Sequence, residues 1–157
     1  MLPGAPVESR WIRKEPRRTL PARWLERMVR CAFPQGRVLE VQPLTDGFRN
    51  SNFKLRIDSL AEPVVLRVYE HDPTLCQKEL DLFGLVRSSV PVPEVIYREP
   101  EGAGDLLPFV LMLYVEGITF RELKRRGDPS AIAQAARSTG ETLAAIHRHV
   151  FAKSGWL

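Results

Sequence analysis

The sequence predicts an α+β fold: a five-stranded antiparallel sheet with one packed helix, preceded by a helical extension and followed by further helices. Three observations support this prediction. Short segments rich in Val, Ile and Leu lie between turn residues from position 38 to 117, one helical pattern interrupts them, and helical spacing alone follows. A chain of 157 residues, 44% hydrophobic and 27% charged, fits one globular domain or one domain plus part of a second.

Residues 1–37 are the first predicted part, a loose basic arm followed by a helix. Thr19 is in position to cap this helix, with Pro21 near its first turn, and Pro34 and Gly36 end it. The apolar positions at helical spacing are Leu25, Met28, Val29 and Ala32.

The charge of the chain is concentrated in this first part. It holds nine Lys or Arg against three Glu, whereas the rest of the chain holds 14 basic and 16 acidic residues. Such a segment could contact nucleic acid or an acidic surface. Because no interleaving of aromatic and basic residues accompanies the charge, a solvated helix face is the favoured interpretation, and nucleic acid is not an expected partner.

Residues 38–117 are the second predicted part and hold the sheet. Segments 38–41 and 53–57 flank an Asp46-Gly47 turn and alternate well enough for an antiparallel pair. The remaining strands are predicted at 63–69, 94–97 and 108–114, and a helix follows residues 71–73 through about Arg87. The last strand is nearly all apolar and is therefore expected inside the sheet. The helix is expected to turn four apolar side chains inward: Leu75, Leu80, Phe83 and Val86.

Residues 118–157 are the third predicted part. Thr119 is predicted to cap a short helix through Lys124, and residues 129–150 have the spacing of a long helix. Its apolar stripe has no evident partner, so we expect the stripe to be exposed together with Phe151 and Trp156. The stripe consists of Ile132, Ala136, Thr139, Leu143, Ile146 and Val150.

The sequence indicates neither a membrane segment nor a disulfide. The longest apolar run, residues 108–115, is too short to cross a bilayer, and residues 1–16 lack a signal pattern, so a cytoplasmic location is expected. Cys31 and Cys76 lie in periodic, core-like contexts, which favours free buried thiols.

Three groups of residues are candidates for ligand contacts. The first is the hairpin, where Gly47 lets the backbone approach an anion and Asn50 and Ser51 could add polar contacts. The second is Arg67, central on a strand, with Glu79 about a turn into the next helix. Because a buried cation needs an anion, we expect these two to pair.

The third group lies where the last strand passes into a linker. Backbone groups of Leu113 and Val115 are free there for the edge of a base, and apolar side chains of Val65, Met112 and Leu113 could sandwich its ring. Taken singly, an ordinary Asp-Gly hairpin, a surface salt bridge and a plain core strand explain these groups better. These separate explanations do not account for the fixed order and spacing of the three groups along the chain.

Several motifs in fixed order carry a family resemblance. They are the turn from Asp46 to Phe53, Arg67, Glu79, the run Val90-Pro-Val-Pro-Glu-Val-Ile96, the linker from Met112 to Gly117, and the helix from Gly140 to His147. From about residue 44 to 147 the sequence resembles the aminoglycoside phosphotransferase family, which also holds homoserine-, choline- and fructosamine-kinase-like enzymes.

The resemblance implies a protein-kinase-like small lobe followed by the first helices of a large lobe. It further implies that ATP lies under the Gly47 hairpin, with Arg67, held by Glu79, on its phosphates and the linker on its adenine. Two residues depart from the family pattern. Asp46 replaces a common glycine and brings negative charge near the expected phosphates, and Arg67 stands where Lys is frequent, which changes the contact geometry.

The resemblance also implies a catalytic His-Gly-Asp loop and a metal-binding Asp beyond the long helix. No His-Gly-Asp occurs in this sequence, and His147 and His149 are interpreted as ordinary helix residues. We therefore expect the N-terminal, ATP-binding part of a kinase for small hydroxylated substrates, inactive alone and using Mg²⁺ only when completed by its C-terminal lobe or a second chain. The alternatives are a non-catalytic binding or regulatory module and one half of a split enzyme.

Overall fold

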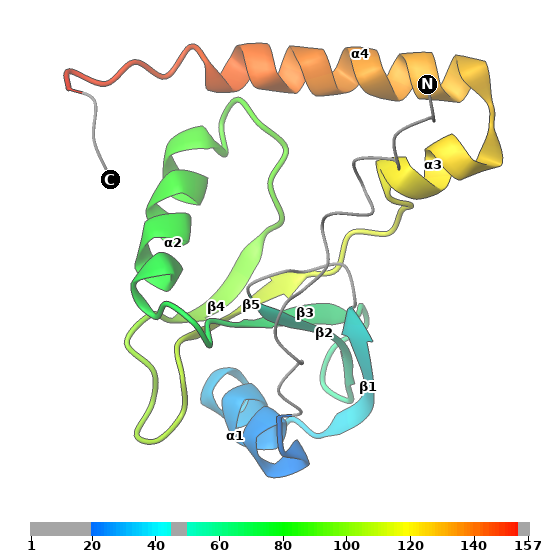
Figure 1. Cartoon of the computed structure of the whole chain (residues 1–157). Helices are drawn as coiled ribbons and strands as arrows, with labels where there is room; N and C mark the ends of the chain where they lie inside the picture. Colours follow the sequence, from blue (N-terminus) through cyan, green and yellow to red (C-terminus); the bar gives the residue numbers. More distant parts are fainter. Residues whose placement is uncertain (1–19, 45–49, 154–157) are drawn as a thin grey trace, which may run out of the picture.

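The computed structural model describes residues 20–44 and 50–153, and it confirms the predicted α+β fold (Figure 1). All five predicted strands are present, each displaced by no more than a few residues. The elements in chain order are α1 (Ala22–Ala32), β1 (Val38–Leu44), β2 (Ser51–Ile57), β3 (Val64–Val68), α2 (Thr74–Val86), β4 (Val95–Glu99), β5 (Phe109–Leu113), α3 (Phe120–Arg126) and α4 (Pro129–Ile146).

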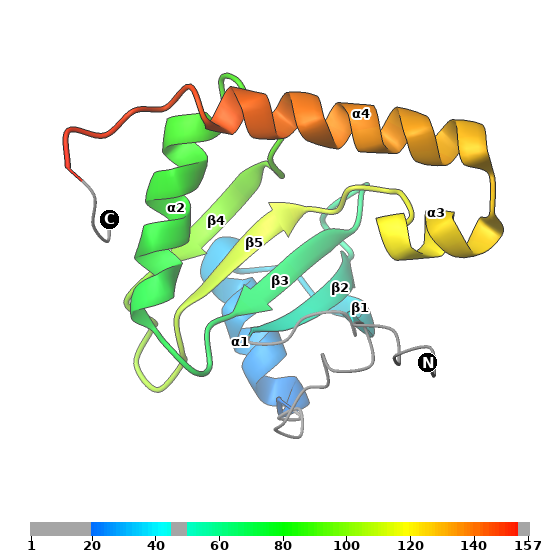
Figure 2. The ribbon, with the colours of Figure 1, turned by 45° about the horizontal axis from the view of Figure 1, so that its top comes forward.

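The strands form one antiparallel sheet in the order β1-β2-β3-β5-β4 (Figure 2). The last strand in the chain, β5, lies between β3 and β4, as its apolar composition predicted. The register pairs Lys54 with Val65, and Val65 with Met112. Residues paired across neighbouring strands share a face of the sheet, so this register decides which side chains can meet.

Alternation along the strands gives the sheet two different faces. One face carries Phe53, Leu55 and Ile57 from β2 and packs on α1 through Met28 and Val29, all of them buried. Thus α1 contributes to the same hydrophobic core as the sheet.

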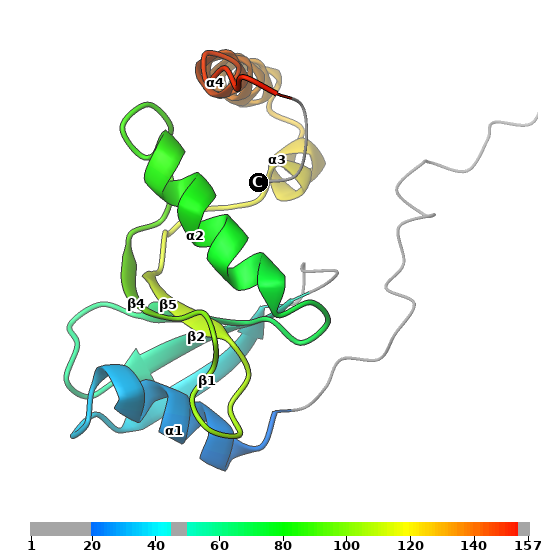
Figure 3. The same cartoon turned by 90° about the vertical axis from the view of Figure 1, so that its left-hand side faces the viewer.

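The opposite face of the sheet is covered by α2 over part of its area. Figure 3 shows α1 and α2 on opposite sides of the sheet. Cys76 and Leu80 of α2 form a second cluster with Tyr69, Val110 and Met112. Of the four side chains expected to face inward, Leu80 is buried, while Leu75 and Phe83 are half-buried against this cluster.

The two last helices begin at side-chain caps. The Thr119 hydroxyl accepts from the Glu122 N–H, as predicted, and the Asp128 carboxylate accepts from the N–H groups of Ser130 and Ala131. In α4 the buried residue is Ala145, whereas Leu143 and Ile146 are 49% and 39% exposed. The predicted stripe is therefore exposed except at Ile132, which is half-buried. The neighbouring row of smaller side chains is more covered, with Ala131, Ala135 and Thr142 half-buried beside buried Ala145.

Three helix boundaries differ from the prediction. Helix α3 ends at Arg126 rather than at Lys124. Helix α1 begins at Ala22 with Pro21 as its N-cap and no side-chain cap, and Thr19 lies outside the described residues. Helix α4 ends at Ile146 rather than at residue 150. The Arg148 and His149 N–H groups bond three residues back, which closes the last turn. His149 thus lies beyond the helix, with its Nε2 3.0 Å from the Ser89 Oγ.

Neither cysteine forms a disulfide, as predicted. Cys76 is buried and Cys31 is half-buried; burial raises the pKa of the Cys76 thiol to about 11. Within residues 20–44 and 50–153, no helix combines the length and the hydropathy that a bilayer crossing requires.

Two glycine substitutions test this backbone in opposite directions. Gly84 lies inside α2, and an added Cβ would have no atom within 4 Å, so Gly84→Ala should raise the unfolding free energy by about 0.5–1 kcal/mol. Gly102 has φ +80°, and an added Cβ would lie 2.2 Å from the Leu106 carbonyl oxygen, so Gly102→Ala should lower it by more than about 1 kcal/mol. Urea denaturation measures both. A loss of stability in Gly84→Ala would contradict the open surroundings of that residue.

Candidate functional site

The predicted ion pair joins the sheet to the helix that covers it. Arg67 is the fourth residue of β3 and Glu79 is the sixth of α2. The Arg67 Nη2 donates to Glu79 Oε1 at 2.6 Å, and the two side chains are 29% and 26% exposed. Because both are largely covered, this pair is less screened by water than a surface pair.

A tyrosine that was not among the predicted residues holds the other oxygen of Glu79. The Tyr69 hydroxyl donates to Glu79 Oε2. Tyr69 is fully buried, and its backbone N–H donates to the Pro108 carbonyl at 3.0 Å. Burial and then the bond to Glu79 raise the pKa of Tyr69, so its hydroxyl stays protonated and remains a donor. Tyr69 directly follows β3, and its two-residue spacing from Arg67 in extended chain, which puts both side chains on one face, was the available signal.

Asn50 holds the guanidinium from the other side. With its amide oxygen turned toward Arg67, Asn50 accepts from Nε at 3.2 Å and from Nη2 at 3.1 Å. Asn50 is 7% exposed and directly precedes β2. Glu79 and Asn50 together occupy one edge of the guanidinium. Among residues 20–44 and 50–153, the Nη1 N–H groups have no partner, so they remain available to an anion.

Two of the three residues predicted to sandwich a ring, Val65 and Met112, lie beside this network. The prediction was wrong for the Leu113 side chain, because Leu113 pairs with Val64 and packs on the α1 side of the sheet. Val65 and Met112 are directly paired across β3 and β5, on the same face as Arg67. Lys54 continues the row on β2, with its Nζ 3.8 Å from the centroid of the Tyr114 ring and 3.4 Å from Glu116 Oε1. Lys54 was not among the predicted residues, although the register of β2 places it opposite Val65.

The linker after β5 offers fewer backbone groups than predicted. The Leu113 N–H donates to the Glu94 carbonyl at 2.9 Å, so at most the carbonyl of Leu113 is available to a ligand. The Tyr114 N–H is also occupied, by the Pro63 carbonyl at 3.1 Å. The Val115 N–H has no bond within the part of the chain that the structure describes, and its side chain is 68% exposed.

Of the predicted hairpin residues, the structure describes Asn50 and Ser51, and these two lie on opposite faces of the sheet. Gly47 lies outside the described residues. Ser51 is 6% exposed and shares the alternation of Phe53 and Leu55, so it lies on the α1 side of the sheet, opposite the face of Arg67. Strand alternation separates Ser51 from Asn50, although the two are adjacent in the chain.

The sheet, the covering helix and the Arg67–Glu79 pair define the small lobe of a kinase-like fold. Two solved structures share this fold. The ternary complex of APH(2")-IIa with streptomycin and ATP has 18% identity and a TM-score of 0.55 over 86% of this chain and 42% of its own. Aminoglycoside phosphotransferase APH(4)-Ia has 19% identity and a TM-score of 0.56 over 80% of this chain and 39% of its own. The chain thus spans less than half the length of either protein.

A family model extends this result to the sequence. The model described as the phosphotransferase enzyme family matches residues 40–156, and the chain belongs to that family. No curated protein gives a significant match.

The Tyr69 contact can be tested through stability. Tyr69→Phe leaves a largely buried carboxylate oxygen without its donor and should lower the unfolding free energy by about 1–3 kcal/mol. Tyr97→Phe is the matched control, because its hydroxyl donates to Glu99 at 3.0 Å in a less buried setting. The loss of unfolding free energy should therefore be smaller in Tyr97→Phe than in Tyr69→Phe. Urea denaturation compares the two variants, and equal losses would contradict a special role for Tyr69.

Proposed function

We propose that this chain is the N-terminal, ATP-binding part of a kinase that transfers a phosphoryl group from ATP to a hydroxyl of a small substrate. Membership in the phosphotransferase family and the shared kinase-like fold support the reaction class. A bound ATP in one protein of this fold supports the nucleotide.

One observation carries the proposal. Arg67 is held by Glu79 and Asn50 along one edge, and its Nη1 keeps two N–H donors without a partner among the described residues. A guanidinium fixed in this way suits phosphate oxygens, which accept paired N–H donors. We assign Arg67 to the nucleotide phosphates, and Glu79 and Asn50 to holding its orientation. Arg67 thus takes the place of the lysine that many kinases use.

The other predicted residues complete the nucleotide site. We propose that the base lies against Val65 and Met112, that the linker at Leu113 and Val115 contacts its edge, and that the Gly47 hairpin covers the phosphates. Mg²⁺ would be held in the complete enzyme by carboxylates that this chain does not include, where it neutralises charge on the phosphates. Residues 38–117 would then form the nucleotide-binding lobe after a basic extension, residues 1–37.

The exposed face of α4 supports a partner for residues 118–157. Leu143, Ile146, Val150 and Phe151 are exposed within a short stretch of the chain. Exposed apolar residues that occur together in this way are typical of an interaction surface. We propose that this surface packs against the remainder of a helical lobe. In a non-catalytic module or a split enzyme, the same surface would bind a second chain.

Nucleotide binding is expected to depend on Arg67. Isothermal titration should detect ATP binding, and Arg67→Met should weaken it by roughly tenfold or more, because bonds to charged groups contribute about 1.5–3 kcal/mol. Adenosine, which has no phosphate, should bind both proteins equally. Arg137→Gln is the control, since it removes the same charge from the exposed surface of α4. Absence of ATP binding, or equal weakening for ATP and adenosine, would contradict the assignment.

Phosphoryl transfer is not expected from this chain alone, because it contains no His-Gly-Asp motif. Radiolabelled ATP should leave small amino-alcohol and sugar substrates unlabelled, and any transfer would refute this expectation.

An immunoblot of source cells separates the alternatives. A product well above 17.9 kDa indicates part of a larger kinase, whereas a stable product at 17.9 kDa favours a module or a split enzyme.

A further inference from the structure

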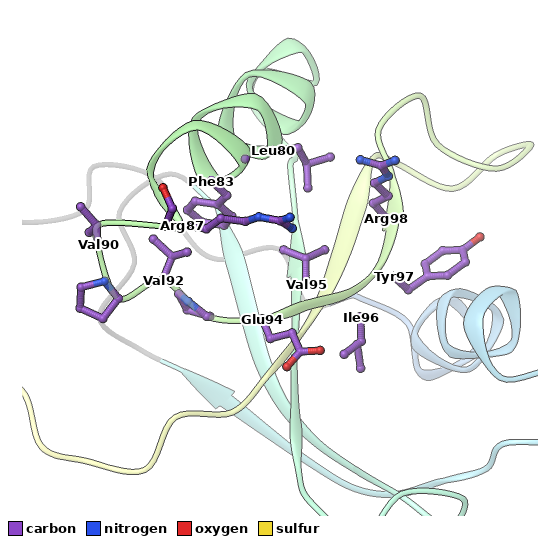
Figure 4. Close-up of a pocket in the computed structure, with 14 residues that line it drawn as sticks. Leu80, Phe83, Arg87, Val90, Val92, Glu94, Val95, Ile96, Tyr97 and Arg98 are labelled. Atoms are coloured by element: carbon purple, nitrogen blue, oxygen red, sulfur yellow. The ribbon is translucent and has the colours of Figure 1, made fainter. Parts of the chain in front are cut away.

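A cavity lies away from the residues assigned to the proposed ATP site. It has a volume of about 680 Å³, within the range of small-molecule sites, and is bounded by the second half of α2, the proline-rich connection and β4 (Figure 4). Arg67, Glu79, Val65 and Met112 are not among its lining residues. This cavity is therefore distinct from the proposed ATP site.

The helical wall of this cavity follows from the periodicity of α2. Leu80, Phe83, Gly84 and Arg87 recur at spacings of three and four residues and line the cavity together. Gly84 leaves a gap in this wall, because an added Cβ there would meet no atom within 4 Å. Val95 contributes apolar surface from the side of β4, so the body of a ligand would be apolar.

Two cations, Arg87 and Arg98, line the same cavity. For Arg87 and Arg98, no salt bridge or side-chain hydrogen bond is formed to any residue in 20–44 or 50–153. Glu94 also lines the cavity, but Figure 4 shows its carboxylate directed away from the Arg87 guanidinium, which extends between Leu80 and Val95. An apolar wall with unpaired guanidinium groups is complementary to an anion that carries an apolar body.

We propose that this cavity is a binding site for a small amphipathic anion, an aromatic or aliphatic body with one acidic oxygen group. The body would contact Leu80, Phe83 and Val95, and the acidic group would accept hydrogen bonds from Arg87 and Arg98. The proposal does not rest on ATP binding, so it can be tested separately from the proposed function.

Amide NMR titration of the full chain with naphthoate tests the site. Saturable shifts are expected at β4 and the second half of α2, and neutral naphthamide should bind more weakly. Gly84→Leu fills the cavity and should abolish the shifts. The double change Arg87→Gln with Arg98→Gln should weaken binding on the order of tenfold, while Arg137→Gln should have no effect.

Each outcome of this titration is decisive. Absence of saturable shifts in the unchanged chain, or shifts confined to the exposed face of α4, would overturn the proposal. Equal binding by the unchanged chain and the double arginine variant would also overturn it, and this comparison does not depend on whether Gly84→Leu folds. Preferential loss of naphthoate over naphthamide binding in the arginine variant would establish the charge recognition.

Discussion

A guanidinium on an inner strand is the constraint around which this small lobe is organised. Arg67 lies on β3 with strands on both sides and α2 above it, so most of its N–H groups must find partners within the protein. Glu79 comes from α2, and Asn50 comes from the start of β2. One side chain therefore connects the covering helix, the sheet and the end of the hairpin.

The same network links packing to chemistry. Tyr69 belongs to the hydrophobic cluster between the sheet and α2, yet its hydroxyl orients the carboxylate that holds Arg67. A change in how α2 packs would therefore alter the direction of the guanidinium. Because α2 also forms one wall of the cavity near β4, the two candidate sites share a structural element.

Much of the fold was predictable because it rests on local patterns. Alternation in β2, the apolar run of β5 and the spacing in α2 led to the observed sheet and covering helix. The Arg67–Glu79 pair was also predicted, since a cation on an inner strand has few other options. Helix ends were less predictable. Helix α4 ends at Ile146, where backbone hydrogen bonds form the last turn, and no residue type in the sequence indicates this end. The contacts of Tyr69 and Lys54 were not predicted, because they join different elements: Tyr69 bonds to Glu79 of α2, and Lys54 of β2 contacts Tyr114 and Glu116 after β5.

The sequence by itself determined the order of elements, the apolar faces and the family, because these follow from periodicity and motif spacing along the chain. Only the tertiary structure decided which polar groups meet. It separated Ser51 from Asn50 by strand alternation, occupied the Leu113 N–H with the Glu94 carbonyl, and left Nη1 of Arg67 without a hydrogen-bond partner among the described residues. These outcomes depend on how strands and helices from distant parts of the chain are brought side by side.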